Sequence, residues 1–188
     1  MKSLIVKTVA ITLAILITVG AGIYLLLATV SPRVLSNAYF KVQNERLSIK
    51  YSQKAYEKSN DISDLATLTE RCILFGEKDL TISYGVRFIN DDNYGEYISS
   101  KNQGYHYYIV SSICTAEYER GDKLVAVETA FSNTNEYLSL NPIHKLIILS
   151  AQSEDKATLT EIKNRLEIRQ DKNELVNQHI TLIIELIN

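Results

Sequence analysis

The sequence predicts an all-α protein that begins with a membrane helix, and three observations support this class. A charge-free apolar run opens the chain, apolar residues recur at helical spacing after it, and Ser, Asp, Asn or Gly occupies most of the breaks. The chain has 188 residues, of which 46% are hydrophobic, so about one domain with an apolar core remains beyond the anchor. We expect an anchor at 1–31, a juxtamembrane helix at 32–60 and a helical domain at 61–188.

The anchor is the uncharged run 8–31. A helix needs about 20 apolar residues to cross a bilayer core of ~30 Å, because its backbone amides must be bonded within the helix. A cleaved signal peptide is the alternative, since Lys2 and Lys7 precede the run. The apolar part of such a peptide is typically about 7–15 residues long and is followed by a small-residue cleavage site. This run is longer, and we therefore expect an uncleaved, single-pass signal anchor.

The orientation of the anchor does not follow from its flanking charges, because basic residues lie on both sides of the run. Long domains translocate largely regardless of their charge, and the tail before the run is very short and basic. We therefore expect the tail inside and the helical domain on the extracytoplasmic side.

Ser31-Pro32 marks the start of the next helix, because serine caps helices and proline is tolerated at the first helical position. Apolar residues at helical spacing then predict one helix over about 33–58. The apolar stripe shifts between Val42 and Leu47, which indicates a bend or a small change of register.

The next two segments are predicted to be helices of about 63–75 and 80–90. The first follows several capping residues and stops at Gly76. The second is rich in Thr, Ile, Tyr and Val and also fits an alternating strand. We favour a helix there, since an isolated strand among helices would not be stable. A loop that contains one helical turn is predicted at 91–104.

The tripeptide Arg120-Gly121-Asp122 lies between predicted helices of about 107–120 and 123–134. Glycine commonly ends a helix and aspartate commonly caps one. We therefore interpret the tripeptide as an elbow between two helices. An adhesive tripeptide would need a long loop, which this position does not provide.

The C-terminal part predicts three more helices. Asn141-Pro142 marks the start of a helix that ends near residue 152, and the next helix covers about 155–170. The last helix covers 173–188 and is apolar over most of its circumference. It either folds back onto the bundle or docks onto another subunit, which would make a homo-oligomer.

Three helix pairs with short turns follow from this assignment: 63–75 with 80–90, 107–120 with 123–134, and 142–152 with 155–170. The middle pair combines a Gly-Asp turn with small residues at Cys114, Ala126 and Ala130. It resembles a tetratricopeptide repeat (TPR), in which small residues let two helices approach closely. The resemblance covers about 60–170 and implies a TPR-like array of helical hairpins. The alternative is an irregular helical bundle, because Gly76 and Gly121 are 45 residues apart whereas the repeat is typically about 34 residues long.

Several function classes are not supported by the composition. The formal net charge is −2, whereas a nucleic-acid-binding domain is typically basic on one face, so no nucleic acid is expected. Cys72 and Cys114 lack metal-ligand spacing, and two buried thiols are favoured over a disulfide. The three histidines, His106, His144 and His179, fall on separate predicted helices, which favours structural roles. No catalytic, metal or cofactor motif occurs, so we expect no cofactor and no enzymatic activity.

Tyrosines concentrate in one stretch and form the main candidate surface. Tyrosine is favoured where a surface is both apolar and hydrated, as at protein interfaces, although the same residues could fill the core instead. The predicted partner-binding residues come from this stretch and from the last helix: Tyr94, Tyr97, Tyr105, Tyr107, Tyr108, Leu182, Ile183 and Leu186.

Together these features predict a membrane-anchored helical scaffold or adaptor that binds another protein. The abundance of Ile, Asn, Lys and Tyr and the lack of Trp suggest a bacterium, so we expect an accessory subunit of a bacterial envelope assembly. The alternative is a membrane-bound sensor or enzyme whose pocket forms only in the tertiary structure. A pocket with two or more converging ionisable side chains would favour that alternative, whereas a concave groove lined by tyrosines would favour the scaffold.

Overall fold

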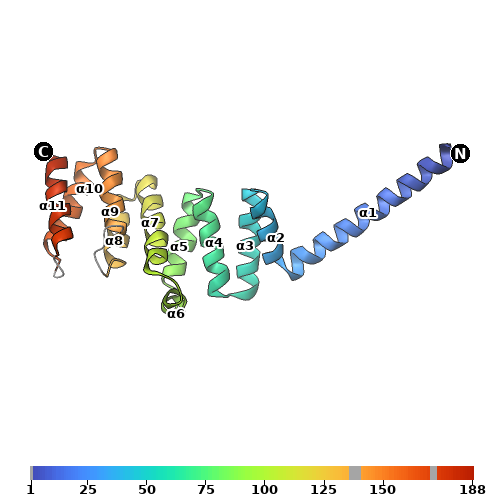
Figure 1. Cartoon of the computed structure of the whole chain (residues 1–188), viewed down its shortest axis with the longest axis horizontal. Helices are drawn as coiled ribbons and strands as arrows, with labels where there is room; N and C mark the ends of the chain where they lie inside the picture. The colour runs from blue at the N-terminus through green and yellow to red at the C-terminus, as the bar shows by residue number, and fades with distance from the viewer. Residues whose placement is uncertain (1, 136–140, 170–172) are drawn as a thin grey trace. The chain divides into compact units, whose positions relative to one another are not determined.

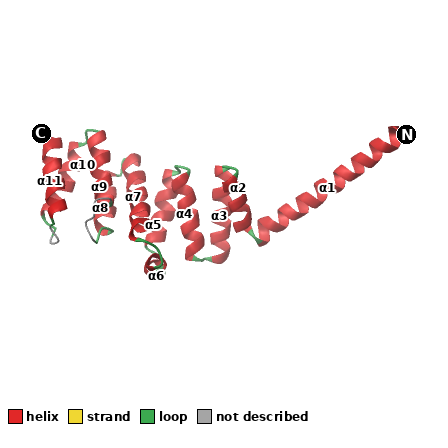
Figure 2. Ribbon diagram, viewed as in Figure 1, coloured by secondary structure: helices red, strands yellow, loops and turns green. Residues whose placement is uncertain are grey.

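The structure is a computed structural model that describes residues 2–135, 141–169 and 173–188 (Figure 1). Within these ranges the only regular secondary structure is helical (Figure 2), which confirms the all-α class. The helices follow one another as α1 (Lys2–Val30), α2 (Pro32–Lys41), α3 (Glu45–Ser59), α4 (Ile62–Leu74), α5 (Lys78–Ile89), α6 (Tyr94–Ser99), α7 (Gln103–Arg120), α8 (Lys123–Ser132), α9 (Pro142–Gln152), α10 (Lys156–Glu167) and α11 (Glu174–Ile187).

Two compact units divide the chain between Asp64 and Leu65. The first unit contains α1, α2, α3 and the first residues of α4. The second contains the rest of α4 and all the helices that follow. The division lies within α4, four residues after the boundary that was expected between 60 and 61.

The helix α1 contains the apolar run. Its segment Lys7–Val30 is long and apolar enough to cross a membrane, and none of it is buried in the protein. At 1.5 Å per residue these 24 residues extend ~36 Å, slightly more than the ~30 Å hydrocarbon core of a bilayer. An N-terminal signal sequence meets the same criteria of length and composition.

The prediction of one helix over 33–58 is wrong, because the chain turns back between α2 and α3. Gln43 has a φ of 55°, in the left-handed region that interrupts a right-handed helix. Asn44 then caps α3 by accepting a hydrogen bond from the amide of Leu47 at 3.1 Å. The shift in the apolar stripe therefore marks the turn of a helical hairpin.

Serine side chains fill the space between α2 and α3. The hydroxyl oxygens of Ser36 and Ser52 lie 2.5 Å apart, and the Ser36 hydroxyl is also within hydrogen-bonding distance of the Ser48 carbonyl at 3.2 Å. All three residues are buried. Beside them the rings of Tyr39 and Tyr51 stack with centroids 5.6 Å apart. This hairpin is thus joined by hydrogen bonds and ring contacts as well as by apolar packing.

Apolar side chains from α7 to α11 form the main core of the second unit. Its fully buried members include Val110, Cys114, Val127, Leu146 and Ile162. In this unit α7 packs against α5, α8 and α9, and α10 packs against α11. The core therefore joins the pairs α7–α8 and α9–α10 and the last helix.

Segment 80–90 is helical, as predicted, and one of its residues sets the distance between α5 and α7. Gly85 is buried, and a Cβ atom there would lie only 2.6 Å from Cγ1 of Ile113. No side chain fits at this contact without a shift of Ile113. Gly85 is thus a helix-packing residue.

The elbow at Arg120-Gly121-Asp122 is confirmed, with one correction. The first helix ends at Arg120, Gly121 has a φ of 101°, and α8 begins at Lys123. The carboxylate of Asp122 accepts a hydrogen bond from Nε of Arg120 at 2.5 Å and none from the amides of α8. Asp122 therefore occupies the N-cap position, but its side chain caps no helix.

Candidate functional site

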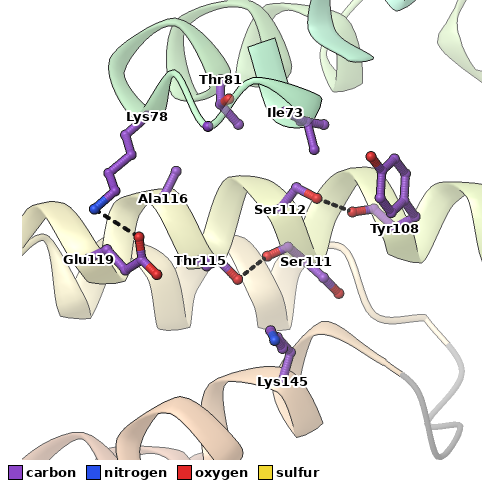
Figure 3. A pocket seen from close by; sticks show the side chains of 11 residues that line it. Ile73, Lys78, Thr81, Tyr108, Ser111, Ser112, Thr115, Ala116, Glu119 and Lys145 are labelled. Atoms are coloured by element: carbon purple, nitrogen blue, oxygen red, sulfur yellow. Dashed lines mark hydrogen bonds and ion pairs between the residues drawn. The ribbon is translucent and has the colours of Figure 1, made fainter. Parts of the chain in front are cut away.

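A hollow of about 400 Å³ lies over one face of α7 in the second unit (Figure 3). In that view α7 forms its floor, the end of α4 and the start of α5 form one wall, and Lys145 of α9 lies on the opposite side. We call this hollow the α7 groove. Its lining residues are Ile73, Gly76, Lys78, Thr81, Tyr108, Ser111, Ser112, Thr115, Ala116, Glu119 and Lys145.

The floor of the α7 groove is made of short side chains. The hydroxyl of Ser112 donates to the carbonyl of Tyr108 at 2.8 Å, and that of Thr115 donates to the carbonyl of Ser111 at 2.8 Å (Figure 3). A hydroxyl that donates in this way keeps lone pairs that accept hydrogen bonds from a ligand. The floor therefore admits close approach of a ligand and offers it acceptors.

One end of the α7 groove is charged. Nζ of Lys78 lies 2.9 Å from Oε2 of Glu119, and both side chains are about half exposed. Lys145 is exposed and makes no ion pair with any residue in the described ranges. The paired charges compensate each other, so Lys145 gives the lining a net positive charge.

The other part of the groove is apolar. Tyr108 is 41% exposed, and Ile73 lies on the wall that faces it (Figure 3). Partial burial, helped by the nearby charge of Glu70, raises the pKa of the Tyr108 hydroxyl. At neutral pH this side chain is therefore an uncharged ring with a hydroxyl that can donate a hydrogen bond.

Three of the predicted tyrosines make contacts that join α6 and α7 to neighbouring helices. The rings of Tyr94 and Tyr97 meet Phe88 edge-on, with centroids 5.1 and 5.6 Å away. Tyr105 donates a hydrogen bond to Oε1 of Glu70 at 2.7 Å. Burial raises the pKa of the Tyr94 hydroxyl to about 12 and, with the Glu70 contact, raises the pKa of Tyr105 as well. These contacts support the structural alternative for the three residues.

The other two predicted tyrosines differ in position. Tyr107 is buried, whereas the exposed Tyr108 lines the α7 groove. A second hollow, of about 380 Å³, lies beside α6 and is lined by Tyr94, Gly95, Ile98, Lys101, His106, Tyr107 and Asn135. Of the five tyrosines, Tyr108 lines the α7 groove and Tyr94 and Tyr107 line the second hollow, so the predicted tyrosines form no single continuous surface.

The partner-binding residues predicted on the last helix differ in their exposure to solvent. Ile183 is fully buried in the core with Val176, whereas Leu182 and Leu186 are 39% and 38% exposed. The buried face confirms that α11 folds back onto the second unit. Ile183 therefore cannot contact a partner while the unit is folded, and only the two leucines remain available.

A histidine pair was not foreseen from the sequence. Nδ1 of His144 on α9 lies 2.8 Å from Nε2 of His179 on α11. Burial lowers the pKa of both imidazoles, and the charge of His144 lowers that of His179 further. In the neutral pair one ring nitrogen donates and the other accepts, so the contact helps to hold α11 on α9.

The described part of the chain shows neither a metal-binding site nor a reactive thiol. No group of three or more His, Cys, Asp or Glu residues there is placed to hold a metal ion. Cys72 and Cys114 are free and buried, as predicted, and burial raises the pKa of the Cys72 thiol to about 12. Such thiols are unreactive at neutral pH because the thiolate is the nucleophile.

No protein-family model matches this chain, and no curated protein matches its sequence. The chemistry of the α7 groove is therefore inferred from its geometry. Within the described ranges, none of its hydroxyls is bonded to a histidine or a carboxylate, the contact that would activate a nucleophile. The groove offers shape, hydrogen-bond acceptors and one uncompensated positive charge, which suit binding.

Proposed function

We propose that the protein is a membrane-anchored helical scaffold whose α7 groove binds a segment of a protein partner. The observation that carries this proposal is the groove itself, with a floor of short side chains between an apolar part and a charged part. Short side chains let the backbone or a helix of a partner come close, as in other grooves that take peptides. Tyr108 and Ile73 would contact apolar side chains of the partner, and Lys145 would contact an acidic one.

A TPR-like arrangement of the second unit is part of this proposal. Support comes from the short Gly121-Asp122 turn between α7 and α8, and from Ala126 and Ala130, which are buried in the core. Small buried residues allow the close packing of paired helices on which such repeats depend. Stacked pairs present the faces of successive helices side by side, which would give the groove its walls.

The mechanism we propose is tethering. With α1 as a single-pass anchor and the helical units on the extracytoplasmic side, the chain would raise the effective concentration of a partner near the bilayer. Such a role suits an accessory subunit of a bacterial envelope assembly. The exposed Leu182 and Leu186 on α11 would provide a second contact, with another subunit or a second copy of the chain.

A sensor or enzyme is the competing proposal, and one observation favours it. Three ionisable side chains, those of Lys78, Glu119 and Lys145, line the α7 groove. Acid–base catalysis needs a group that is free to exchange a proton with the substrate. Lys78 and Glu119 are bonded to each other at a solvent-exposed edge, which leaves Lys145 as the one groove residue of the three without an ion pair in the described ranges. We therefore favour binding over catalysis.

The test is a peptide selection with a matched blocking variant. A phage-displayed peptide library is panned against the full chain in detergent micelles, and the affinities of enriched peptides are measured by fluorescence anisotropy. Ser112→Tyr should fill the groove and weaken binding at least tenfold. The control Ser83→Tyr places the same ring on an exposed position of α5 outside the groove and should bind like the wild type.

Two results would contradict the proposed function. One is a selection that enriches no peptide above the background of empty micelles. The other is equal affinity of the wild type and Ser112→Tyr for every enriched peptide. Circular dichroism of both variants shows whether the helical fold is retained.

A further inference from the structure

The first unit presents a row of basic side chains on α3. Arg46, Lys50 and Lys54 recur every four residues and so lie along one side of the helix. All three are exposed, and none makes an ion pair within the described ranges. One acid, Glu57, lies at the C-terminal end of the row, where it accepts a hydrogen bond from Gln53 at 2.8 Å. The row is thus a strip of three positive charges without described ion-pair partners, with one acid at its C-terminal end.

Contacts from α3 fix it beside the last turns of α1. The hydroxyl oxygens of Tyr24 and Tyr51 lie 2.5 Å apart, and their rings meet edge-on with centroids at 6.4 Å. Nearer the end of α1, Nζ of Lys58 donates to the carbonyls of Thr29 at 3.2 Å and Val30 at 2.8 Å. These carbonyls have no partner inside α1, because they belong to its last turn. Two separate contacts thus hold α3 against α1.

The depth of these contacts along α1 brings the basic row to the membrane surface. The ~30 Å hydrocarbon core holds only about 20 of the 24 apolar residues, so the end of α1 reaches the headgroup region. Tyr24 lies near that end, and tyrosine rings favour the interface. Nζ of Lys54 lies 5.5 Å from the centroid of the Tyr51 ring, and the Tyr51 hydroxyl in turn contacts that of Tyr24. The ammonium group of Lys54 therefore lies near the C-terminal end of the apolar helix, where α1 would leave the hydrocarbon core.

We propose that Arg46, Lys50 and Lys54 bind the headgroups of anionic phospholipids where α1 leaves the bilayer. This inference rests on the proposed anchoring by α1. The negative charge of such headgroups complements the row, and each basic side chain close to an anionic surface strengthens binding about fivefold. The contact fixes the orientation of the α2–α3 hairpin on the membrane. It also makes the position of the hairpin depend on lipid composition, which anchoring by α1 alone would not.

The chain contains no tryptophan, so a single introduced tryptophan is the only indole in the protein. The full chain with the single substitution Gln53→Trp, next to the basic row, is reconstituted into vesicles that carry a small fraction of dansyl-labelled lipid. Energy transfer from the indole to the dansyl headgroups reports how close α3 lies to the surface. Transfer is compared in phosphatidylcholine alone and in phosphatidylcholine with 30 mol% phosphatidylglycerol.

We expect transfer to rise in the phosphatidylglycerol vesicles and to fall again in 1 M NaCl, where the Debye length is only about 3 Å. Exchange of Arg46, Lys50 and Lys54 for Gln should abolish the rise. The charge-preserving variant Arg46→Lys/Lys50→Arg/Lys54→Arg should retain it. Equal transfer in the two lipid mixtures, or an unchanged rise in the Gln variant, overturns the proposal.

Two further arms separate this proposal from its premises. Flotation of the vesicles after a high-pH wash tests anchoring, because an inserted chain stays with neutral vesicles whatever the state of the basic row. A chain that floats but shows no lipid-dependent transfer retains its anchor and lacks the headgroup site. Inorganic phosphate at 10 mM is the second of these arms: if it removes the rise at constant ionic strength, the row is a general phosphate site and the lipid proposal is wrong.

Discussion

In both hairpins, α2–α3 and α7–α8, two helices pack closely, but different residue types line the two contacts. Both need small residues where their helices approach: α2–α3 uses Ser36 and Ser52, whereas α7–α8 uses Ala126, Ala130 and Cys114. The serine contact must satisfy its own hydroxyls within the interface, because an unpaired buried polar group costs about 1–3 kcal/mol. The small apolar side chains of α7–α8 have no such requirement, and the polar exception there is the buried Glu117 of α7, which hydrogen-bonds to Thr129 of α8. Stability in the second unit should therefore respond to volume changes, and in the first to the loss of polar partners.

The largest effect on stability should come from a cavity in the core of the second unit. Ile113 is fully buried on α7, and Ile113→Ala should lower the free energy of unfolding by about 3 kcal/mol, since truncations of this kind cost about 2–5 kcal/mol. Urea denaturation of the full chain in micelles, followed by circular dichroism, measures this. The exposed Val125→Ala is the control and should change stability by less than about 0.5 kcal/mol. Equal losses for the two variants would show that Ile113 is not in a close-packed core.

A smaller effect should follow from adding volume at the same contact. Gly85→Ala gains about 1 kcal/mol of helix propensity but forces a Cβ against Ile113, and overpacking of this kind costs typically about 1–3 kcal/mol. We expect a net loss of about 1 kcal/mol in the same denaturation assay. Gly95→Ala on α6 meets open space and should be neutral or stabilising. A stabilised Gly85→Ala protein would mean that α5 and α7 pack less tightly than described.

The polar contacts of the first unit are tested by removing Arg33, the charged partner of Asp64. Asp64 is buried and accepts hydrogen bonds from Nε and the terminal nitrogen of Arg33, each at 2.7 Å, and from the Ser59 hydroxyl at 2.6 Å. Arg33→Gln removes two of these, but water reaches the exposed arginine side, so we expect a loss of about 1 kcal/mol. Arg46→Gln removes a charge without a described partner and should leave stability in micelles unchanged. Identical behaviour of the two variants would exclude a role for the Arg33 contact.

The smallest effect should be a pH dependence of the His144–His179 contact. Both imidazoles have a pKa below the ordinary value of about 6.5, so the native state binds protons less readily than the unfolded chain. Their contribution to stability is present above pH 6.5 and is lost as the pH falls through the lowered native values. Urea midpoints from pH 8 to pH 5 should show a fall that is reduced in the double variant His144→Gln/His179→Gln. A fall of the same size in both proteins would assign it to other groups.

The order of the helices could be predicted because the residue types at their ends mark where most of them begin and stop. Asn141 accepts a hydrogen bond from the amide of His144, as its cap position suggested, and Gly121 ends α7 in the left-handed region. The break at 42–44 was missed because glutamine at position 43 gives no sign of a positive φ, a conformation for which glycine or asparagine is more usual. Local sequence identifies turns only where the residue type matches the conformation.

The candidate site could be predicted only in part, since it depends on contacts between distant segments. Tyr108 was included in the predicted surface, but the serines and threonine of the groove floor carry no pattern that distinguishes them from other polar helix residues. Ile183 belonged to an apolar face whose covered side was set by α9 and α10. The two histidines of the pair are 35 positions apart, a separation over which helical periodicity carries no information.

The contacts between α3 and α1 have a mechanical consequence. The Tyr24–Tyr51 and Lys58–Val30 contacts join α3 to α1 at two positions along its axis, so the two helices would be expected to move together. An apolar segment that is longer than the bilayer is thick tilts to remain covered. If α1 spans a bilayer as proposed, a change in bilayer thickness would therefore also change the tilt of the α2–α3 hairpin.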